Sequence, residues 1–136
     1  MKRSEHTSDP VKREEGAWVK DIPGMGDLIL KVRGVNNRDW RRMQGKLVNA
    51  VPRSKRVDGV LDPDEQDRIN IILLRECCLL DWRNFEDDDG VVAYTKERAG
   101  KELGDPEFTD FREAVMWAAL EVAKAGQFEI EGDAKN

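Results

Sequence analysis

The stretch DPDEQDRINIILLRECCLLDW, Asp62 to Trp82, decides the fold of this chain. Asp62 can accept hydrogen bonds from the free N–H groups of a first helical turn, Pro63 is tolerated there, and Glu65 stands where a capping box places it. Apolar residues then surround most of the helix circumference, so we predict a central, buried helix that runs to about Leu80. Its apolar residues are Ile69, Ile71, Ile72, Leu73, Leu74, Cys77, Cys78 and Leu80.

Four consecutive acidic residues and a glycine, Glu86 to Gly90, follow that helix. In an EF-hand alignment on Gly90, the first ligand position falls on Phe85 and the twelfth on Lys96, so the two most important carboxylates are missing. Consecutive solvated carboxylates also offer acid–base catalysis no pair with separated pKa values. We therefore predict a turn at 89–90 and a small strand at 91–94, with a weak cation site as the alternative.

Few residues in the chain suit catalysis or metal binding. His6 is the only histidine, and Cys77 and Cys78 are the only cysteines. Zinc would have too few ligands at the wrong spacing, and no Ser–His or Cys–His pair is expected. The sequence GMG at 24–26 precedes a strand pattern rather than a helix, so it is not a phosphate loop. We expect a protein that is not an enzyme and that binds no metal or other cofactor.

The composition favours one folded domain, which we place at 16–130. Charged residues make up 38% of the chain and hydrophobic residues 39%, with a formal net charge of −5. The apolar residues come in periodic blocks, which suffices for a core. Because the chain has neither an apolar run of ~20 residues nor a secretory h-region, we expect no membrane association and a cytoplasmic location. The cysteines are then reduced, small apolar residues.

The charge is distributed unevenly along the chain. Residues 1–56 carry an excess of Lys and Arg, and residues 57–136 carry an excess of Asp and Glu. This polarity favours partners of both signs, or head-to-tail self-association of copies.

A basic cluster at 38–56 could neutralise phosphates, so a nucleic-acid-binding accessory protein is an alternative function. Neither a recognition helix nor an aromatic stacking platform accompanies the cluster, so nucleic acid is not the partner that we expect. The other interpretation is a solvated face and loop. The cations are Arg38, Arg41, Arg42, Lys46, Arg53, Lys55 and Arg56.

The N-terminal third predicts an arm, a hairpin and a helix. Residues 1–15 are polar and aperiodic, which is typical of a mobile arm. Two short β-type runs at 17–20 and 28–33 flank the Pro/Gly-rich turn DIPGMGD, so we predict a β-hairpin. Asn36 or Asn37 can cap the next helix. That helix has Trp40, Met43 and Leu47 at helical spacing, ends at Pro52 and leads into a basic loop at 53–59.

Two further helices are expected near the C-terminus. Thr95 can cap a short helix that stops at Gly104, and Asp105 with Pro106 can start a longer one that ends at Gly126. Residues 131–136 are predicted to be a frayed acidic tail. The buried stripe of the longer helix comprises Phe108, Phe111, Val115, Ala118 and Val122.

These elements predict an α+β fold dominated by helices. An N-terminal β-hairpin packs on a small bundle of three main helices and one short helix. Trp40 and Trp82 fall at apolar helix positions and are expected in the core.

Trp117 falls off the apolar stripe of the last helix by about half a turn, and Leu120 follows it. Because tryptophan is enriched at interface hot spots, we take Trp117 and Leu120 as candidate partner-binding residues. Burial of Trp117 in the core is the alternative. Arg38, Arg41 and Arg42 are the other candidates.

Several short motifs follow one another in a distinctive order: GAWV at 16–19, VRGVNNRDW at 32–40, LLDW at 79–82, AYTKERA at 93–99 and DPEFTDFREAV at 105–115. Between the third and fourth lies the acidic turn with its Asp-Gly pair. Over about residues 16–128, this order resembles the tail assembly chaperones of long-tailed, siphovirus-type phages and prophages.

The resemblance implies a non-enzymatic protein of the host cytoplasm that is absent from the mature virion. Chaperones of this family bind the long, aggregation-prone tape measure protein and keep it soluble. They also help to recruit tail tube protein around it. The family has no catalytic residues to transfer to this chain. A structural tail or head component retained in the virion is the remaining alternative.

Overall fold

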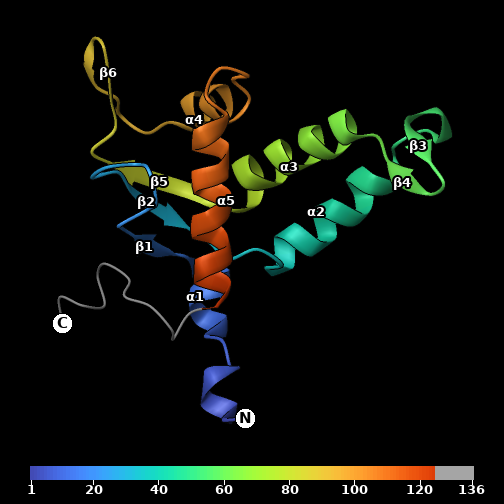
Figure 1. The fold of residues 1–136 in the computed structure, drawn as a ribbon, viewed down its shortest axis with the longest axis horizontal. Helices are drawn as coiled ribbons and strands as arrows, with labels where there is room; N and C mark the ends of the chain where they lie inside the picture. Colours follow the sequence, from blue (N-terminus) through green and yellow to red (C-terminus); the bar gives the residue numbers. More distant parts are fainter. Residues whose placement is uncertain (125–136) are drawn as a thin grey trace.

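The computed structural model describes residues 1–124 and confirms the predicted α+β class (Figure 1). A three-stranded antiparallel sheet lies at its centre, and two short hairpins stand apart from that sheet. The helices are α1 (Pro10–Glu15), α2 (Arg38–Asn49), α3 (Pro63–Cys77), α4 (Lys96–Leu103) and α5 (Thr109–Ala123). The strands are β1 (Ala17–Val19), β2 (Ile29–Val32), β3 (Arg56–Val57), β4 (Val60–Leu61), β5 (Leu79–Arg83), β6 (Glu86–Asp87) and β7 (Gly90–Val91).

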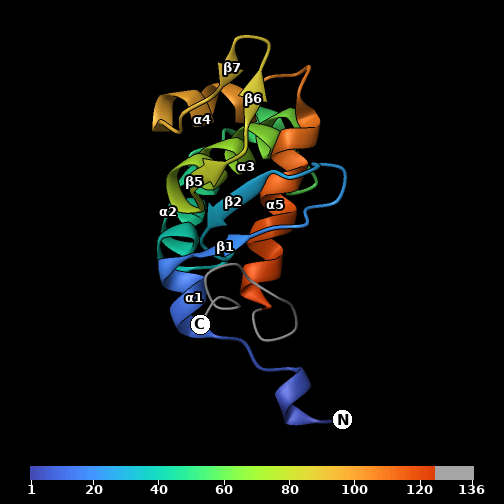
Figure 2. The ribbon, with the colours of Figure 1, turned by 90° about the vertical axis from the view of Figure 1, so that its left-hand side faces the viewer.

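The central sheet has the strand order β1-β2-β5. The predicted hairpin is confirmed, since β1 pairs with β2 and Trp18 stands opposite Lys31. Successive side chains of a strand point to opposite faces, and here Val19, Leu30 and Val32 are buried. Helix α5 lies along this buried face (Figure 2). The sheet and α5 thus enclose one part of the core, to which α3 and α4 also contribute buried side chains.

Helix α3 begins as predicted but ends earlier. The Asp62 carboxylate accepts a hydrogen bond from the Asp64 N–H at 3.1 Å, which confirms the N-cap. The helix stops at Cys77 rather than near Leu80, and Leu79–Arg83 continue as strand β5. Pairing with β2 satisfies the backbone of this segment and turns alternate residues toward the core. Tertiary packing therefore overrides the local helical pattern.

Helices α2 and α3 lie side by side and extend away from the sheet, with the β3–β4 hairpin at their far end (Figure 1). The segment 53–59, expected as a basic loop, forms a 3₁₀ turn (Arg53–Lys55) and part of this hairpin. The Arg56 guanidinium donates to the carbonyl groups of Val48 and Val51 at the end of α2. One cation of the basic cluster therefore caps a helix C-terminus.

The acidic run forms the turn that we predicted, between β6 and β7. The strand after it is shorter than expected, because the ladder ends at Val91. The hairpin is tied to α4, because the Arg98 guanidinium donates to the Asp87 carboxylate of β6 at 2.9 Å. Thr95 caps α4 as predicted and accepts from the Arg98 N–H at 3.0 Å.

Helix α5 starts later than predicted. The Asp105 side chain accepts from the Glu107 N–H at 2.8 Å in a local turn, and the helix begins at Thr109. An Asx turn of this kind competes with the N-cap that the Asp-Pro pair suggested. The predicted stripe is buried from Phe111 to Val122, and Phe108 packs against it. The predicted helix end at Gly126, the domain end at 130 and the tail at 131–136 lie outside the described residues.

Part of the predicted N-terminal arm is helical. Residues 10–15 form α1, whose first N–H groups are capped by the Asp9 carboxylate. The helix contacts α5, and the Gly34 N–H donates to the Arg13 carbonyl at 3.0 Å. Regular secondary structure is therefore present before Gly16, and both the mobility of the arm and the domain boundary at residue 16 stay predictions.

Candidate partner-binding surfaces

One face of α5 carries a stripe in which Asp110, Glu113, Trp117 and Leu120 follow at helical spacing. Trp117 is half-buried and packs against the core, whereas Leu120 keeps 43% of its surface exposed. The two expectations for Trp117 are thus both partly met, because one part of the indole contacts the core and another part stays at the surface. Leu120 is an exposed apolar side chain with its neighbour Trp117 one turn away.

A pocket of about 340 Å³ opens where this stripe meets the β1–β2 loop. The loop folds tightly, because the Met25 N–H donates to the Ile22 carbonyl and the Leu28 N–H to the Met25 carbonyl, both at 3.1 Å. Ile22 is also anchored in the core, with 3% of its surface exposed. The β1–β2 loop therefore forms one wall of the pocket, and hydrogen bonds and burial within the chain fix its shape. The lining residues are Ile22, Pro23, Gly24, Met25, Asp110, Glu113, Ala114 and Trp117.

The rim of this pocket is acidic and its floor is apolar. Asp110 and Glu113 are exposed, and within residues 1–124 no hydrogen bond or ion pair involves either carboxylate. The same holds for the Trp117 indole N–H. A partner in the pocket would therefore meet two unneutralised carboxylates and a donor without an acceptor. Leu120 does not line the pocket but lies beside it on the same face of the helix, and we call the pocket together with Leu120 the α5 groove.

The second candidate set lies on another helix. Arg38, Arg41 and Arg42 are exposed on the first turns of α2. Arg41 donates to the Asn36 carbonyl at 2.8 Å, and Arg42 lies 3.9 Å from the Asp39 carboxylate. The structure brings these arginines together, but on a helix other than the one that carries Trp117 and Leu120.

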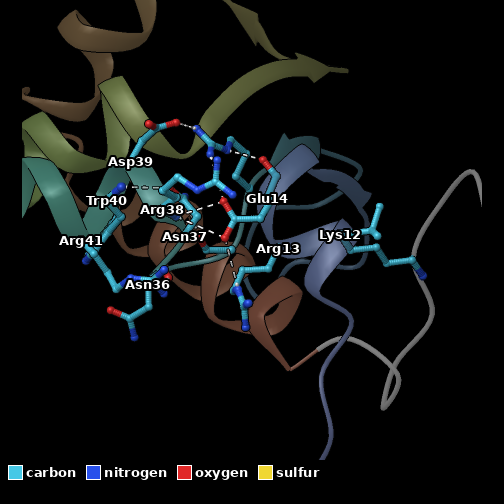
Figure 3. A network of polar contacts seen from close by, with 12 residues as sticks. Lys12, Arg13, Glu14, Asn36, Asn37, Arg38, Asp39, Trp40 and Arg41 are labelled. Carbon is cyan, nitrogen blue, oxygen red and sulfur yellow. Dashed lines mark hydrogen bonds and ion pairs between the residues drawn. The ribbon is translucent and has the colours of Figure 1, made fainter.

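A polar network fixes the start of α2 (Figure 3). Asn37, not Asn36, is the N-cap, and its side-chain oxygen accepts from the Trp40 N–H at 2.9 Å. The Glu14 carboxylate of α1 accepts from the Arg38 N–H at 3.0 Å. The Arg33 guanidinium bridges Glu14 and Asp39, at 3.5 and 2.9 Å.

The network has an electrostatic consequence for Glu14. The Arg38 backbone N–H lowers the pKa of this carboxyl group, and the charges of Arg13 and Arg33 act in the same direction. The carboxylate therefore stays ionised at the N-terminus of α2, where the helix dipole favours a negative charge. Glu14, which belongs to the segment predicted to be a mobile arm, thus contacts the start of the helix that carries Arg38, Arg41 and Arg42.

Gly34, whose carbonyl accepts a hydrogen bond from the Asn37 side chain, lies in a confined position beside this network. A Cβ atom there would lie 2.9 Å from the Arg13 Cγ atom and 3.1 Å from the Ala123 backbone. Backbone cannot yield as a flexible side chain does, so we expect Gly34→Ala to lower the free energy of unfolding by about 1–3 kcal/mol. Urea denaturation followed by circular dichroism measures it.

Gly45 supplies the matched control. It lies in the middle of α2, and a Cβ atom there meets nothing within 4 Å. Gly45→Ala should stabilise the protein by about 0.5–1 kcal/mol, because alanine has the higher helix propensity. Equal effects of the two substitutions would show that Gly34 is not confined as described.

The cysteines are packing residues in this structure. Cys77 ends α3, Cys78 follows it, and both are buried. Burial raises the pKa of both thiols, which disfavours the thiolate needed for nucleophilic attack or metal binding. Within residues 1–124, no group of three or more His, Cys, Asp or Glu side chains is placed to hold a metal ion.

Of the residues of the α5 groove, only Trp117 and Leu120 were candidates on the basis of the sequence. Asp110 and Glu113 precede Trp117 at helical spacing, so that periodicity could have revealed them. The contribution of Ile22 and Met25 depends on how the β1–β2 loop meets α5, and no local pattern encodes that contact.

Trp18 was also missed. The Arg83 guanidinium lies 4.0 Å from its ring centroid and Lys31 lies 5.9 Å away, on the sheet face opposite the core. Trp18, Lys31 and Arg83 come together because of the register of β1, β2 and β5, in which Trp18 lies opposite Lys31. The sequence alone does not give this register.

Comparison with known proteins identifies a family. A family model described as "YdaY prophage protein" matches residues 35–136, which is most of the chain and includes α2 to α5. No curated protein and no solved structure matches. Within the described residues, no helix is long and apolar enough to cross a membrane. The chain belongs to the YdaY prophage protein family.

Proposed function

We propose that this prophage protein is a tail assembly chaperone. It binds the tape measure protein, keeps it soluble in the host cytoplasm and assists the assembly of tail tube protein around it. It performs no catalysis, uses no cofactor and is absent from the mature virion. The family match supports the phage-related part of this proposal. The role in tail assembly rests on the order of motifs over residues 16–128.

The observation that carries the proposal is the α5 groove. A chaperone for an aggregation-prone client needs an apolar surface that is open in the free protein. Trp117 lines such a pocket beside the β1–β2 loop, and the exposed Leu120 extends the apolar surface one turn beyond it. Side chains that recur at helical spacing suit an amphipathic client helix laid along the groove. The high share of charged residues, 38%, favours solubility of the resulting complex.

Removal of the exposed apolar side chain tests this site. We expect Leu120→Glu to weaken capture of the tape measure protein at least about tenfold, because a carboxylate would replace the exposed apolar side chain beside the pocket. Its own free energy of unfolding should change by less than about 0.5 kcal/mol, since Leu120 lies at the surface. Affinity capture of co-expressed tape measure protein, with parallel urea denaturation, measures both quantities.

Trp117→Ala should weaken capture as well, with some loss of stability, because half of the indole packs against the core. Val60→Glu is the matched control, since Val60 is an exposed apolar residue of the distant β3–β4 hairpin. Capture that survives both α5 variants would remove the groove from the proposal. If Trp117→Ala unfolds the protein and Leu120→Glu leaves capture unchanged, Trp117 is a core residue and not a partner-binding residue.

Two outcomes would favour other functions. If nucleic acid co-purifies and Arg41→Glu/Arg42→Glu abolishes its binding, the basic face of α2 is the functional surface. If mass spectrometry of purified virions detects the protein, it is a structural tail or head component rather than a chaperone.

A further inference from the structure

We infer that the α5 groove selects a client segment whose apolar anchor is accompanied by Lys or Arg one and two helical turns away on the same face. The inference rests on the proposed function for the identity of the client, and on the groove alone for the chemistry of the segment.

The charge of the rim carries the basic half of this inference. Among residues 1–124, Asp110 and Glu113 are the only ionisable residues that line the pocket, and both are acidic. Within residues 1–124 neither of them has an ion-pair partner. Some acids elsewhere on the surface are paired, as Glu76 is with Lys96 at 2.8 Å and Asp87 with Arg98 at 2.9 Å. Others, such as Asp67 and Asp88, are exposed without a partner among residues 1–124, so what distinguishes Asp110 and Glu113 is their place beside an apolar pocket. The groove thus presents two carboxylates that a bound cation could neutralise.

The dipole of α5 explains only one of these acids. Asp110 lies in the first turn, where a negative charge stabilises a helix. Glu113 lies beyond that turn, where the dipole no longer gives an advantage. Within the described part of the chain, it shares the pocket with Trp117 and with no basic residue. Its position on the rim is therefore a feature of the groove and not of helix capping.

The spacing follows from helix geometry. At 1.5 Å per residue, Glu113 lies about 6 Å and Asp110 about 10 Å along the axis from Trp117. A client helix lying along α5 with its apolar side chain on Trp117 and Leu120 would place residues one and two turns away against the two carboxylates. Lys and Arg can lay their aliphatic stems on Met25 and Ala114 while the charged ends reach the rim.

Fluorescence anisotropy with two peptides tests the inference. The first is a fluorescein-labelled amphipathic helix with Trp and Leu anchors and with Lys one and two turns away. In the second, Glu replaces each Lys. We expect the wild-type protein to prefer the Lys peptide by roughly tenfold at low salt, and less at high salt. The variant Asp110→Lys/Glu113→Lys should prefer the Glu peptide.

Two further variants control for net charge and for folding. Asp67→Lys/Asp88→Lys makes the same change in net charge at exposed sites on other elements and should keep the wild-type preference. Asp110→Asn/Glu113→Gln should bind both peptides equally, and it changes the shape of the groove little. Circular dichroism verifies that each variant is folded.

The outcomes separate this inference from the proposed function. Equal binding of both peptides by the wild type, abolished by Leu120→Glu, would overturn the charge selection and leave the chaperone role intact. If the protein prefers the Lys peptide but captures no tape measure protein, the result would support the charge selection and contradict the chaperone function. If light scattering shows a multimer that Leu120→Glu converts to a monomer, a second copy fills the groove and the inference is overturned.

Discussion

Asn37→Ala is expected to lower the free energy of unfolding by about 4 kcal/mol. Asn37 is fully buried. Its side-chain N–H groups donate to the carbonyls of Gly34 and Cys77, both at 2.8 Å, and its oxygen accepts from the Trp40 N–H. The alanine would leave one N–H and two carbonyl groups buried without partners, at about 1–3 kcal/mol each before relaxation.

The substitution affects more than a helix cap. The bond to Cys77 joins the start of α2 to the end of α3, two segments that are far apart in sequence. An exposed N-cap residue contributes only about 1 kcal/mol. The excess over that value measures what the cross-link between α2 and α3 contributes.

Two neighbouring substitutions sharpen the test. Asn37→Asp keeps the acceptor for Trp40 but turns a carboxylate toward two carbonyl oxygens, so it should destabilise at least as much as alanine. Asn36→Gly should be nearly neutral, because Asn36 is exposed and its φ of 61° suits glycine. Urea denaturation of the three variants measures these effects. A cost for Asn37→Ala below about 1 kcal/mol would show that Asn37 is only a local cap.

Trp82→Ala should have a similar effect, about 3–5 kcal/mol. Trp82 keeps 5% of its surface exposed. Its ring lies 4.9 Å from those of Phe85 and Tyr94 and 5.8 Å from that of Phe111, all edge-on. Its indole N–H donates to the Val92 carbonyl at 2.8 Å. The side chain thus ties β5 both to α5 and to the segment that follows the acidic hairpin.

Trp82→Phe separates the packing from the hydrogen bond. Phenylalanine keeps most of the ring contacts and leaves the Val92 carbonyl without its donor, so we expect a loss of about 1–2 kcal/mol. Chemical denaturation of both variants, followed by far-UV circular dichroism, measures the two terms. Equal losses for Ala and Phe would contradict this division, since the hydrogen bond would then account for the whole effect.

The two residues show how far the sequence determines the fold. Local chemistry located the helix starts correctly where a side chain caps its own first turn, as at Asp62 and Thr95. The choice between Asn36 and Asn37 depends on Cys77, forty residues away in the chain. Trp82 was correctly expected in the core but on a helix, because the run before it is apolar on nearly every side.

Strand β5 shows why the local pattern failed. The run of apolar residues that ends in Leu79 and Leu80 fits a buried helix and a buried strand equally well, and periodicity alone does not separate them. Residues 79–83 form a strand because they pair with β2, which is far away in the sequence. The start of α5 failed for the opposite reason, since Asp105 used its capping oxygen within a turn of its own.

The part of the candidate site that lies on one helix could be predicted from the sequence, and the part contributed by a distant loop could not. Trp117 and Leu120 share one helix, so their common face followed from helical spacing. The acidic rim lies on the same helix and could have been inferred in the same way. The β1–β2 loop that closes the pocket contacts α5 only after folding, and residues far apart in a chain give no periodic signal.

The most direct test of the chaperone proposal is the solubility of the tape measure protein. The long protein encoded just downstream is expressed alone, with this chain, and with its Leu120→Glu variant, and the soluble fraction is measured after centrifugation. We expect the long protein to be insoluble alone, soluble and co-purifying with the wild-type chain, and largely insoluble again with Leu120→Glu. A long protein that stays insoluble beside a folded wild-type chain would contradict the proposed function.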